Sequence, residues 1–439
     1  WTATNTGPRD ATGPRQAGRD GLSCDPVEEA MGMSDDRADL VVVGAGTVGG
    51  WASYFAKADG LERVVVVERG LAGQGASSRA AGIVRAQGGT PATVALGRWS
   101  IDFYNGQAAT LGTDSGFREL GYLILAVTDD DERQGRERVA MQRAEGLDVA
   151  WLTAAEAARL IPTLAPAGHR GGSYIATDGC IDPPRNVRAY SLAMQRAGVE
   201  LRERTSFDGL ILSADGQRVV GVETSRGPIA TERVILTGGP SLRAVGRTAG
   251  IRIPAGAARH TVAVLEPHPA FDVERMPMVF DIGAGLYWRL EEGGLLFGWS
   301  DPDEAPGEAR SINWAMYEQN RARLAGLAPL TADLGLRRIW AATIDYTPDH
   351  LPIFGPGLRD DGRPIAGVTV ASAGGHGMMW GPGVARVAAD LAVGGATEVV
   401  DVRDLGLDRF DAQGRSRLAT DPIALPFPVS AGDEVPVGR

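Results

Sequence analysis

Short apolar runs and segments with helical spacing of apolar residues alternate along most of this chain. Residues 40–43 and 64–67 are uninterrupted apolar runs, which are typical of strands buried on both faces. The pattern predicts further strands at 121–126, 201–207, 218–224, 233–236, 338–344 and 367–373, and helices at 99–111, 129–144, 151–160, 189–197, 315–327 and 384–393. The predicted fold class is therefore α/β.

The first two strands and the helix predicted between them have the pattern of a dinucleotide-binding βαβ unit. Gly44 suits a tight turn, Gly46 a close approach of the backbone to a pyrophosphate, and Gly49 close packing of helix on strand. The pyrophosphate would lie at the N-terminus of the helix, where free N–H groups and the helix dipole favour negative charge. Glu68 follows Gly49 by about 20 positions and suits the hydroxyl groups of a ribose.

Sheet-forming segments of another kind separate these nucleotide-type elements. Residues 260–265, 285–290 and 294–299 predict an antiparallel sheet. We therefore expect two interleaved domains, a dinucleotide-binding one at 38–120, 171–257 and 335–395 and a second one at 121–170 and 258–334. Residues 1–37 lack the apolar core of a signal peptide and predict a disordered extension. Residues 396–439 predict a C-terminal tail, with the proline-rich part 421–436 at the surface.

Composition removes several classes of function. A net charge of −11 argues against nucleic-acid binding, and no apolar stretch reaches the ~18 residues of a membrane span. The two cysteines, Cys24 and Cys180, exclude a disulfide framework and a four-cysteine metal site, and they suggest a reduced, cytoplasmic setting. Lys57 is the only lysine, which argues against a pyridoxal Schiff base. None of the five histidines form a helical zinc pair, so we expect no metal.

Four motifs in order identify a resemblance. They are Gly44-Ala-Gly-Thr-Val-Gly49, Glu68-Arg69 leading to Gly75-Ala-Ser-Ser78, Thr237-Gly-Gly-Pro240, and the segment 340–355 followed by Gly374-Gly-His-Gly377. Over about residues 38–395 the chain resembles the FAD-dependent D-amino-acid oxidase superfamily, particularly its sarcosine oxidase, dimethylglycine dehydrogenase and glycine oxidase branches. The resemblance implies a glutathione-reductase-type fold, in which a Rossmann-like FAD-binding domain is interleaved with a substrate domain built on an antiparallel sheet.

The resemblance also implies which residues contact FAD. The glycine turn would face the pyrophosphate, Glu68 the adenosine ribose, Phe207 the adenine, and the segment 374–379 the pyrimidine end of the flavin. The full set is Gly44, Gly46, Thr47, Val48, Gly49, Glu68, Arg69, Ser77, Ser78, Arg79, Gly82, Ile83, Phe207, Gly238, Gly239, Gly374, Gly375, His376, Gly377, Met378 and Met379.

Departures from the family pattern bear on how the flavin is held and reoxidised. Arg79 stands where some relatives tether FAD through a histidine, and Ala342 stands where others use a cysteine. We therefore predict non-covalent FAD. Leu296 stands where monomeric sarcosine oxidases place a lysine over the flavin. The reduced flavin could therefore pass its electrons either to oxygen or to another acceptor.

The chemistry implied by the resemblance is oxidation of a C–N bond by hydride transfer to flavin N5, followed by hydrolysis of the imine. His376 would hydrogen-bond the cofactor, or else pack against the following helix. Asp345 or Tyr346 would face the substrate, unless Asp345 instead caps a turn, and Arg85 matches a flavin-site arginine of the sarcosine enzymes. These four are the predicted catalytic residues. The predicted substrate residues are Arg85, Arg289, Tyr287 and Trp299, with Arg289 as a solvated strand-edge residue in the alternative.

Two other readings compete with an amine or amino-acid oxidoreductase. One is an FAD-dependent 2-hydroxy-acid dehydrogenase, and the other is the flavin subunit of a larger electron-transfer complex. In each case the expected partners are a small-molecule substrate and an electron acceptor, with neither nucleic acid nor a membrane, and with homo-oligomerisation left open.

Overall fold

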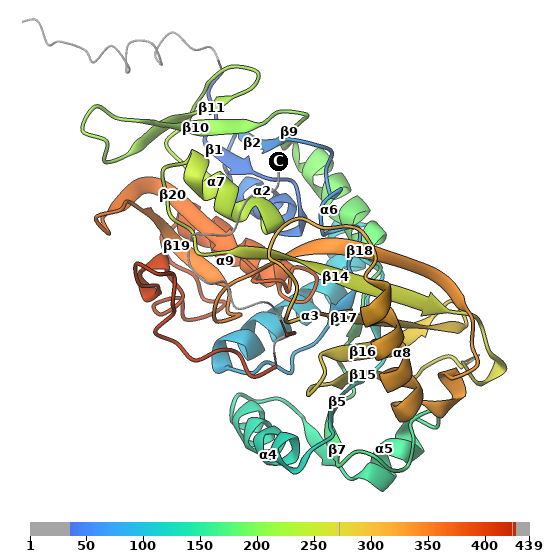
Figure 1. Ribbon diagram of the computed structural model, residues 1–439. Helices are drawn as coiled ribbons and strands as arrows, with labels where there is room; N and C mark the ends of the chain where they lie inside the picture. Colours follow the sequence, from blue (N-terminus) through green and yellow to red (C-terminus); the bar gives the residue numbers. More distant parts are fainter. Residues whose placement is uncertain (1–35, 272, 424, 427–439) are drawn as a thin grey trace, which may run out of the picture.

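A mostly parallel sheet and a mostly antiparallel sheet organise the computed structural model, which describes residues 36–271, 273–423 and 425–426 (Figure 1). Most of the predicted N-terminal extension, and residues 427–436 of the predicted surface tail, lie outside the described residues. The last two residues of that predicted extension join the folded body, since Asp36 pairs with Arg202 and Arg37 bridges to Ala230. Within the described residues, no helix has the length and apolarity that crossing a membrane requires.

The first sheet has six strands and contains the predicted βαβ unit. Its order is β19 (Ile353–Leu358), β20 (Pro364–Ser372), β13 (Val234–Leu236), β1 (Leu40–Val43), β2 (Val64–Glu68) and β9 (Glu200–Glu203). All neighbours run parallel except β19, which is antiparallel to β20. The strands thus come from the start, the middle and the end of the chain, as the interleaved pattern predicted.

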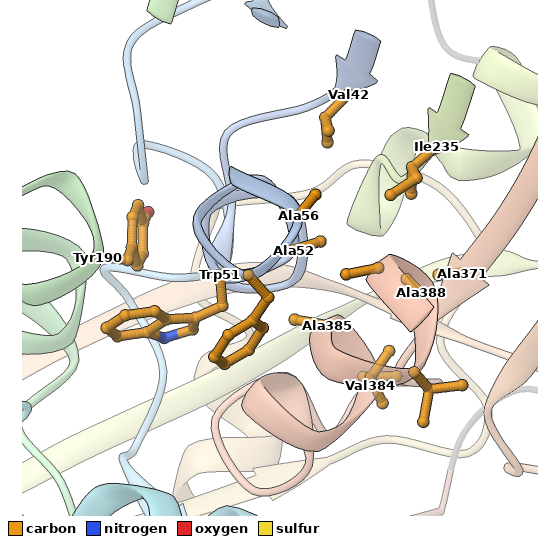
Figure 2. Close-up of a cluster of buried hydrophobic side chains, with 14 of the residues drawn as sticks. Val42, Trp51, Ala52, Ala56, Tyr190, Ile235, Ala371, Val384, Ala385 and Ala388 are labelled. Carbon is orange, nitrogen blue, oxygen red and sulfur yellow. The ribbon is translucent and has the colours of Figure 1, made fainter. Parts of the chain in front are cut away.

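Helices α2 (Thr47–Ala58), α6 (Pro183–Ala197) and α9 (Gly381–Val393) cover one face of this sheet. Alanines at the contact allow α2 and α9 to approach each other and the sheet closely, while Trp51 and Tyr190 fill the space toward α6. Figure 2 shows this packing for Val42, Trp51, Ala52, Ala56, Tyr190, Ile235, Ala371, Val384, Ala385 and Ala388. Alternate strand residues point to the other face, so both faces are buried, as the continuous apolar runs predicted.

The other face is covered by a small sheet of β10 (Phe207–Leu212), β11 (Val219–Thr224) and β12 (Ile229–Ala230), and by helix α7 (Leu242–Thr248). The single strand predicted at 201–207 is wrong: it is divided between β9 and β10. Arg204 turns the chain between them with a positive φ of 52°, and Thr205 donates its N–H to the Glu68 carbonyl. The hairpin therefore forms between β10 and β11.

The second sheet has eight strands in the order β18 (Leu336–Tyr346), β14 (Gly256–Leu265), β17 (Gly294–Ser300), β16 (Leu286–Glu291), β15 (Met278–Asp281), β5 (Tyr122–Ala126), β7 (Gly171–Ile175) and β6 (Ala150–Leu152). Pairing is antiparallel except between β15 and β5. The predicted antiparallel sheet is therefore confirmed. Strands β7 and β18 belong to it, although the predicted boundaries at 171 and 335 placed both segments in the nucleotide-binding domain.

The two faces of the eight-stranded sheet have different neighbours. Helices α5 (Ala154–Leu160) and α8 (Trp314–Leu327) pack on one face against Trp288, Phe297 and Trp299. The opposite face presents Tyr122, Tyr287 and other apolar side chains toward the interior of the molecule. The helix predicted at 151–160 begins only at Ala154, because residues 150–152 pair with β7 as a strand and Thr153 caps the helix with Glu156.

Helix α3 (Pro91–Leu111) packs against α9, whereas α4 (Asp129–Ala144) packs on β5 and β7. A small sheet contains β3 (Ile83–Val84), β8 (Gly179–Cys180) and β4 (Arg118–Glu119). Helices α3 and α6 are longer than predicted: a proline starts each one, after the N-cap Thr90 in α3 and after the N-cap Asp182 in α6.

The C-terminal segment returns to the body of the molecule. Arg409 and Asp349 form a fully buried ion pair with an N–O distance of 2.7 Å, and Ser416 donates a further hydrogen bond to Asp349. Beyond them Asp421 and Ile423 are buried. The prediction that the chain from Asp421 onward is a surface tail is therefore wrong for Asp421 and Ile423, which are buried, although Pro422 between them is exposed.

Candidate active site

A cavity of about 630 Å³ lies between the glycine turn of the six-stranded sheet and the inward face of the eight-stranded sheet. This volume is typical of a small-molecule or cofactor site. One end is lined by Glu68, Phe207 and the turn that follows β1. The other end, which we call the chamber, is lined by Arg85, Tyr122, His260, Phe280, Tyr287 and Ile423.

Backbone conformation and packing require two of the three glycines of the turn, Gly44 and Gly49, and leave open space at Gly46. Gly44 has a φ of +98°, which side chains rarely adopt, and a Cβ at Gly49 would lie 1.9 Å from the Gly44 carbonyl oxygen. At Gly46 a Cβ would approach only the Ser77 hydroxyl, at 3.2 Å, and the residue lines the cavity. Gly46 is also the N-cap of α2 and supplies no side chain to the helix N-terminus, so this end of the cavity suits an anionic ligand group.

Glu68 closes the same end. Its carboxylate accepts the N–H of Ala45 at 2.9 Å and the N–H of Gly70 at 2.7 Å, which fixes the side chain beside the glycine turn. A carboxylate has about four acceptor sites, so this one keeps capacity for further hydroxyl donors. Phe207 and Thr248 line the cavity nearby.

The segment after Glu68 crosses the middle of the cavity. Ser77 accepts the N–H of Thr47 at 3.0 Å, and Arg79 donates to the carbonyls of Gln74 and Gly75. Burial, together with the nearby Arg310 guanidinium, lowers the pKa of Arg79. Of the predicted cofactor residues, all but Ser78 and Gly374 line the cavity.

His376 lines the cavity just before α9. Its Nδ1 lies 3.1 Å from the Gly374 carbonyl and its ring lies 4.1 Å from the Trp380 ring, centroid to centroid. Burial, and secondarily the charge of Arg85, lowers the pKa of His376 to about 3. The ring is therefore neutral, and since a carbonyl only accepts, Nδ1 carries the proton and Nε2 is left as an acceptor.

Asp345 and Tyr346, the two predicted catalytic residues on β18, lie in different places. Asp345 lines the cavity, where its carboxyl accepts the Ser372 hydroxyl at 2.9 Å, and burial raises the pKa of Asp345. Tyr346 is buried outside the cavity lining and packs against Gly256, where a Cβ would lie 2.2 Å from its ring. The structure thus brings Asp345 to the site and leaves Tyr346 out of it.

Among the described residues that line the chamber, Arg85 is the one that carries a positive charge. The side chain is only 2% exposed and donates to the carbonyls of Gln87 and Ile423, the latter at 3.0 Å. Asp178 holds the same loop, because its carboxylate accepts the N–H of Ala86 at 2.8 Å and the Gln87 amide at 3.3 Å. Burial raises the pKa of Asp178 to about 6.

A hydrogen-bonded trio on the eight-stranded sheet is a feature that the sequence analysis missed. His260 Nε2 lies 2.5 Å from the Tyr287 hydroxyl, and His260 Nδ1 lies 2.9 Å from the Ser300 hydroxyl. Burial lowers the pKa of His260 to about 4 and raises that of Tyr287. Since the neutral ring carries one N–H, one hydroxyl donates to it and the other accepts from it. His260 and Ser300 are directly opposite each other on β14 and β17, which would have indicated this contact, but the sequence alone does not give the register of the two strands.

Two predicted substrate residues lie elsewhere. Trp299 points to the opposite face of the sheet, where its ring stacks on Phe297 at 5.4 Å, so it is not part of the cavity lining. Arg289 is 4% exposed, pairs with Glu291 at 2.6 Å and donates to the Ala81 carbonyl. It is neither in the cavity lining nor a solvated strand-edge residue, which corrects both expectations. Tyr287 lines the chamber as expected.

The described residues contain no group of three or more histidine, cysteine, aspartate and glutamate side chains that could hold a metal ion. The hydrophobic lining near His376 is provided by Met378 and Met379. The cavity therefore offers anion-binding backbone at one end and, at the other, a chamber of apolar, tyrosine and histidine side chains beside the Arg85 cation.

Comparison with known proteins agrees with this geometry. A family model described as FAD dependent oxidoreductase matches residues 39–391. The glycine oxidase of Pseudomonas aeruginosa is 30% identical over 81% of this chain and 94% of its own length. The 4-methylaminobutanoate oxidase (formaldehyde-forming) of Paenarthrobacter nicotinovorans is 29% identical over 86% of this chain, and the chain covers 46% of that protein. This chain thus spans about half the length of that relative.

Solved structures show the same fold. The glycine oxidase from Geobacillus kaustophilus superposes with a TM-score of 0.73 at 25% identity, over 86% of this chain and all of the other. An L-proline dehydrogenase from P. horikoshii superposes with a TM-score of 0.76 at 23% identity, over 83% and 95%. The predicted fold class and FAD dependence are confirmed, and this chain belongs to the family of FAD-dependent oxidoreductases.

Proposed function

We propose that this protein oxidises a C–N bond of a small secondary or tertiary amine or of an amino acid, by hydride transfer to flavin N5, and that the imine product is then hydrolysed. Relatives named sarcosine oxidase subunit beta, glycine oxidase and 4-methylaminobutanoate oxidase support this class of substrate. FAD, when bound, supplies the hydride acceptor.

One observation carries the proposal: apart from the Arg85 cation, burial shifts the titratable histidine, tyrosine and aspartate side chains beside the chamber toward their uncharged forms. The pKa of His260 is lowered to about 4 and that of His376 to about 3, while the pKa values of Tyr287 and Asp345 are raised. An amine transfers hydride only in its unprotonated form. A chamber that disfavours charge by desolvation favours that form.

The residues present fit FAD. A Cβ at Gly46 would meet nothing but the Ser77 hydroxyl, so the backbone there leaves room for a pyrophosphate at the N-terminus of α2. We propose that Glu68 accepts hydrogen bonds from the ribose and that the segment from Gly375 to Met379 lies against the flavin, with His376 Nε2 as an acceptor toward it. The remaining cofactor contacts are proposed as predicted, apart from Ser78 and Gly374, which lie outside the lining.

Within the chamber each polar group has a proposed task. Arg85 orients a substrate carboxylate through its fork of N–H donors. The Tyr287 hydroxyl, held in place by His260, hydrogen-bonds the unprotonated substrate amine. Met378 and Met379 exclude water from the reacting bond. Asp345, whose pKa burial raises, lines the cavity and offers a carboxyl group to the bound molecules there.

We further propose that FAD is not covalently attached. Arg79 is not a nucleophile for the flavin ring, and Ala342 is a buried methyl group on β18. Acid precipitation of the purified holoenzyme is expected to leave a colourless pellet and a yellow supernatant. Yellow colour that stays with the pellet would show a covalent tether and contradict this proposal.

The decisive experiment for the function is an anaerobic spectral titration of the holoenzyme with a panel of N-methylated amines, amino acids and 2-hydroxy acids. Bleaching of the flavin by amines or amino acids supports the proposal. Bleaching by hydroxy acids alone replaces it with a 2-hydroxy-acid dehydrogenase. If no compound bleaches the flavin until a co-purified protein is added, the chain is the flavin subunit of an electron-transfer complex.

We also propose the electron acceptor of the reduced flavin and the cellular compartment of the protein. Admitting air after bleaching distinguishes oxygen, through rapid recovery of the yellow colour, from another acceptor. The only lysine, Lys57, donates to the carbonyls of Leu61 and Glu62 at the end of α2, remote from the chamber. Leu296 is buried behind the lining. Because neither residue places a lysine cation beside the flavin, we propose an electron acceptor other than oxygen. Low cysteine use supports a cytoplasmic setting.

A further inference from the structure

The end of the described chain forms one wall of the chamber. We call residues 421–423 and 425–426 the strap. Ile423 and Leu425 both line the cavity, although about 340 residues separate Ile423 from Arg85, its hydrogen-bond partner in the wall. Ile423 packs with Tyr122, Tyr287 and other side chains of the inward sheet face. Leu425 packs against Ala258 and Ile344 of the same sheet.

We propose that the strap is the size-selecting wall of the chamber, with Ile423 setting the largest group that a substrate can carry beside its reacting C–N bond and Arg85 holding the strap in place. The inference rests on the proposed function, because it assumes that the chamber receives the substrate.

The strap is fixed to the body at several points, so its position is defined. The N–H of Asp421 donates to the Asp349 carbonyl at 3.0 Å, and the Asp349 side chain forms the buried ion pair with Arg409. The Asp421 carboxyl turns back to accept the N–H of Ile423 at 2.8 Å. Asp421 is itself only 3% exposed. A wall held at both its backbone and its side chains can discriminate by size, whereas a loose segment would move aside.

Arg85 connects the strap to the substrate. Its guanidinium donates to the Ile423 carbonyl and to the Gln87 carbonyl, and it has five N–H donors in all. The Tyr122 hydroxyl also interacts with this guanidinium, and the donors beyond these contacts are the ones assigned to a substrate carboxylate. Binding of that carboxylate and the position of Ile423 therefore share one rigid planar group, so that Arg85 acts on the strap as a positioning residue.

The test compares Ile423→Ala with Leu418→Ala. Leu418 lies in the same C-terminal segment and is half-buried, but it packs against the helical core and does not line the cavity. The substrates are N-methyl-, N-ethyl-, N-propyl- and N-butylglycine, or the matching N-alkyl series of whichever amine bleaches the wild type. Anaerobic stopped-flow measurements give the rate constant of flavin reduction and the substrate dissociation constant.

Ile423→Ala is expected to raise the ratio of reduction efficiency for the N-butyl over the N-methyl compound at least tenfold, because removal of methyl groups from the wall admits a longer chain. Leu418→Ala should leave that ratio within twofold. Ile423→Phe should shift it in the opposite direction, which keeps the test valid if the alanine variant is poorly folded. An unchanged ratio in both Ile423 variants would overturn the inference.

A second readout does not need turnover. Hydrogen exchange of the holoenzyme is expected to show that Arg85→Lys increases the exchange rate of the peptide carrying Ile423 at least tenfold, while the peptide carrying Leu418 changes little. Equal exchange in wild type and variant would show that Arg85 does not hold the strap. If no amine bleaches the wild-type flavin, the proposed function fails, whereas the exchange experiment still decides whether Arg85 positions the strap.

Discussion

Gly49 illustrates how a single residue limits what this site can tolerate. It lies where α2 crosses β1, and a Cβ there would be 1.9 Å from the Gly44 carbonyl oxygen and 3.0 Å from the Thr237 hydroxyl. The first of these contacts is with backbone, so no side-chain rotation relieves it. The turn and the helix must move apart if the position carries a methyl group.

Gly49→Ala is therefore expected to destabilise the protein by about 1–3 kcal/mol, the usual cost of overpacking, and to weaken FAD binding at least tenfold, because the helix N-terminus shifts. Flavin fluorescence titration and urea unfolding measure the two effects. Gly106→Ala in α3 is the matched control, since nothing lies within 4 Å of a Cβ there. Equal FAD affinity in wild type and Gly49→Ala would show that the turn does not need this packing.

The sequence predicted the residues at the nucleotide end of the cavity, but it predicted those of the chamber only in part. The glycine turn and Glu68 lie within one local βαβ unit, so their spacing along the chain carries their geometry. Trp299 and Tyr287 are on neighbouring strands, and which face each one occupies depends on register; a shift by one residue reverses it. The partnership of His260 with Tyr287 likewise exists only once β14, β17 and β16 are paired.

The C-terminal segment shows the same distinction at the level of an element. Local pattern predicted most helices and strands, because apolar periodicity and caps act over a few residues. Residues 396–423 have little regular structure, and their place depends on Arg409, whose side chain is fully buried against Asp349. A buried ion pair formed by residues 60 positions apart leaves no periodic signal in a sequence.

Loss of Arg409 from its ion pair with Asp349 should release the C-terminal segment from the body of the protein. Arg409→Ala leaves the Asp349 carboxylate buried and removes donors from the Leu405 and Leu351 carbonyls, so a loss of about 3–5 kcal/mol in the free energy of unfolding is expected. Urea unfolding of the holoenzyme measures it. Arg417→Ala breaks a solvent-exposed pair with Asp404 in the same segment and should cost less than about 1 kcal/mol. Similar losses in the two variants would contradict the account given for Arg409.

For the whole molecule, neutral buried histidines make stability depend on pH. His260 has a pKa lowered to about 4, whereas an unfolded histidine titrates near pH 6.5. Above pH 6.5 the ring is neutral in both states and the contribution is flat. As the pH falls from 6.5 toward 4, the unfolded chain takes up a proton that the native state refuses, so stability is lost.

His260→Asn removes this contribution. At pH 5.0 His260 costs the native state about 2 kcal/mol relative to pH 7.5, so the destabilisation caused by the substitution should be about 2 kcal/mol smaller at pH 5.0 than at pH 7.5. Urea unfolding of both holoenzymes at each pH gives the difference. Between pH 7.5 and 8.5 the effect of the substitution should not change, which serves as the internal control. The same effect at pH 5.0 and pH 7.5 would mean that the buried ring protonates freely.

The interleaved sheet also determines when the cofactor site comes into existence during synthesis. The Thr237 hydroxyl that secures the glycine turn donates to the Val43 carbonyl at 2.6 Å, across 194 residues of sequence. Translation at ~5–20 residues per second separates the two by roughly 10–40 s. During that interval β1 has left the ribosome without its neighbour β13, so one edge of this apolar strand stays unpaired. Pairing over such sequence distances is slow, and we expect the exposed apolar strands to be prone to aggregation until their partner strands emerge.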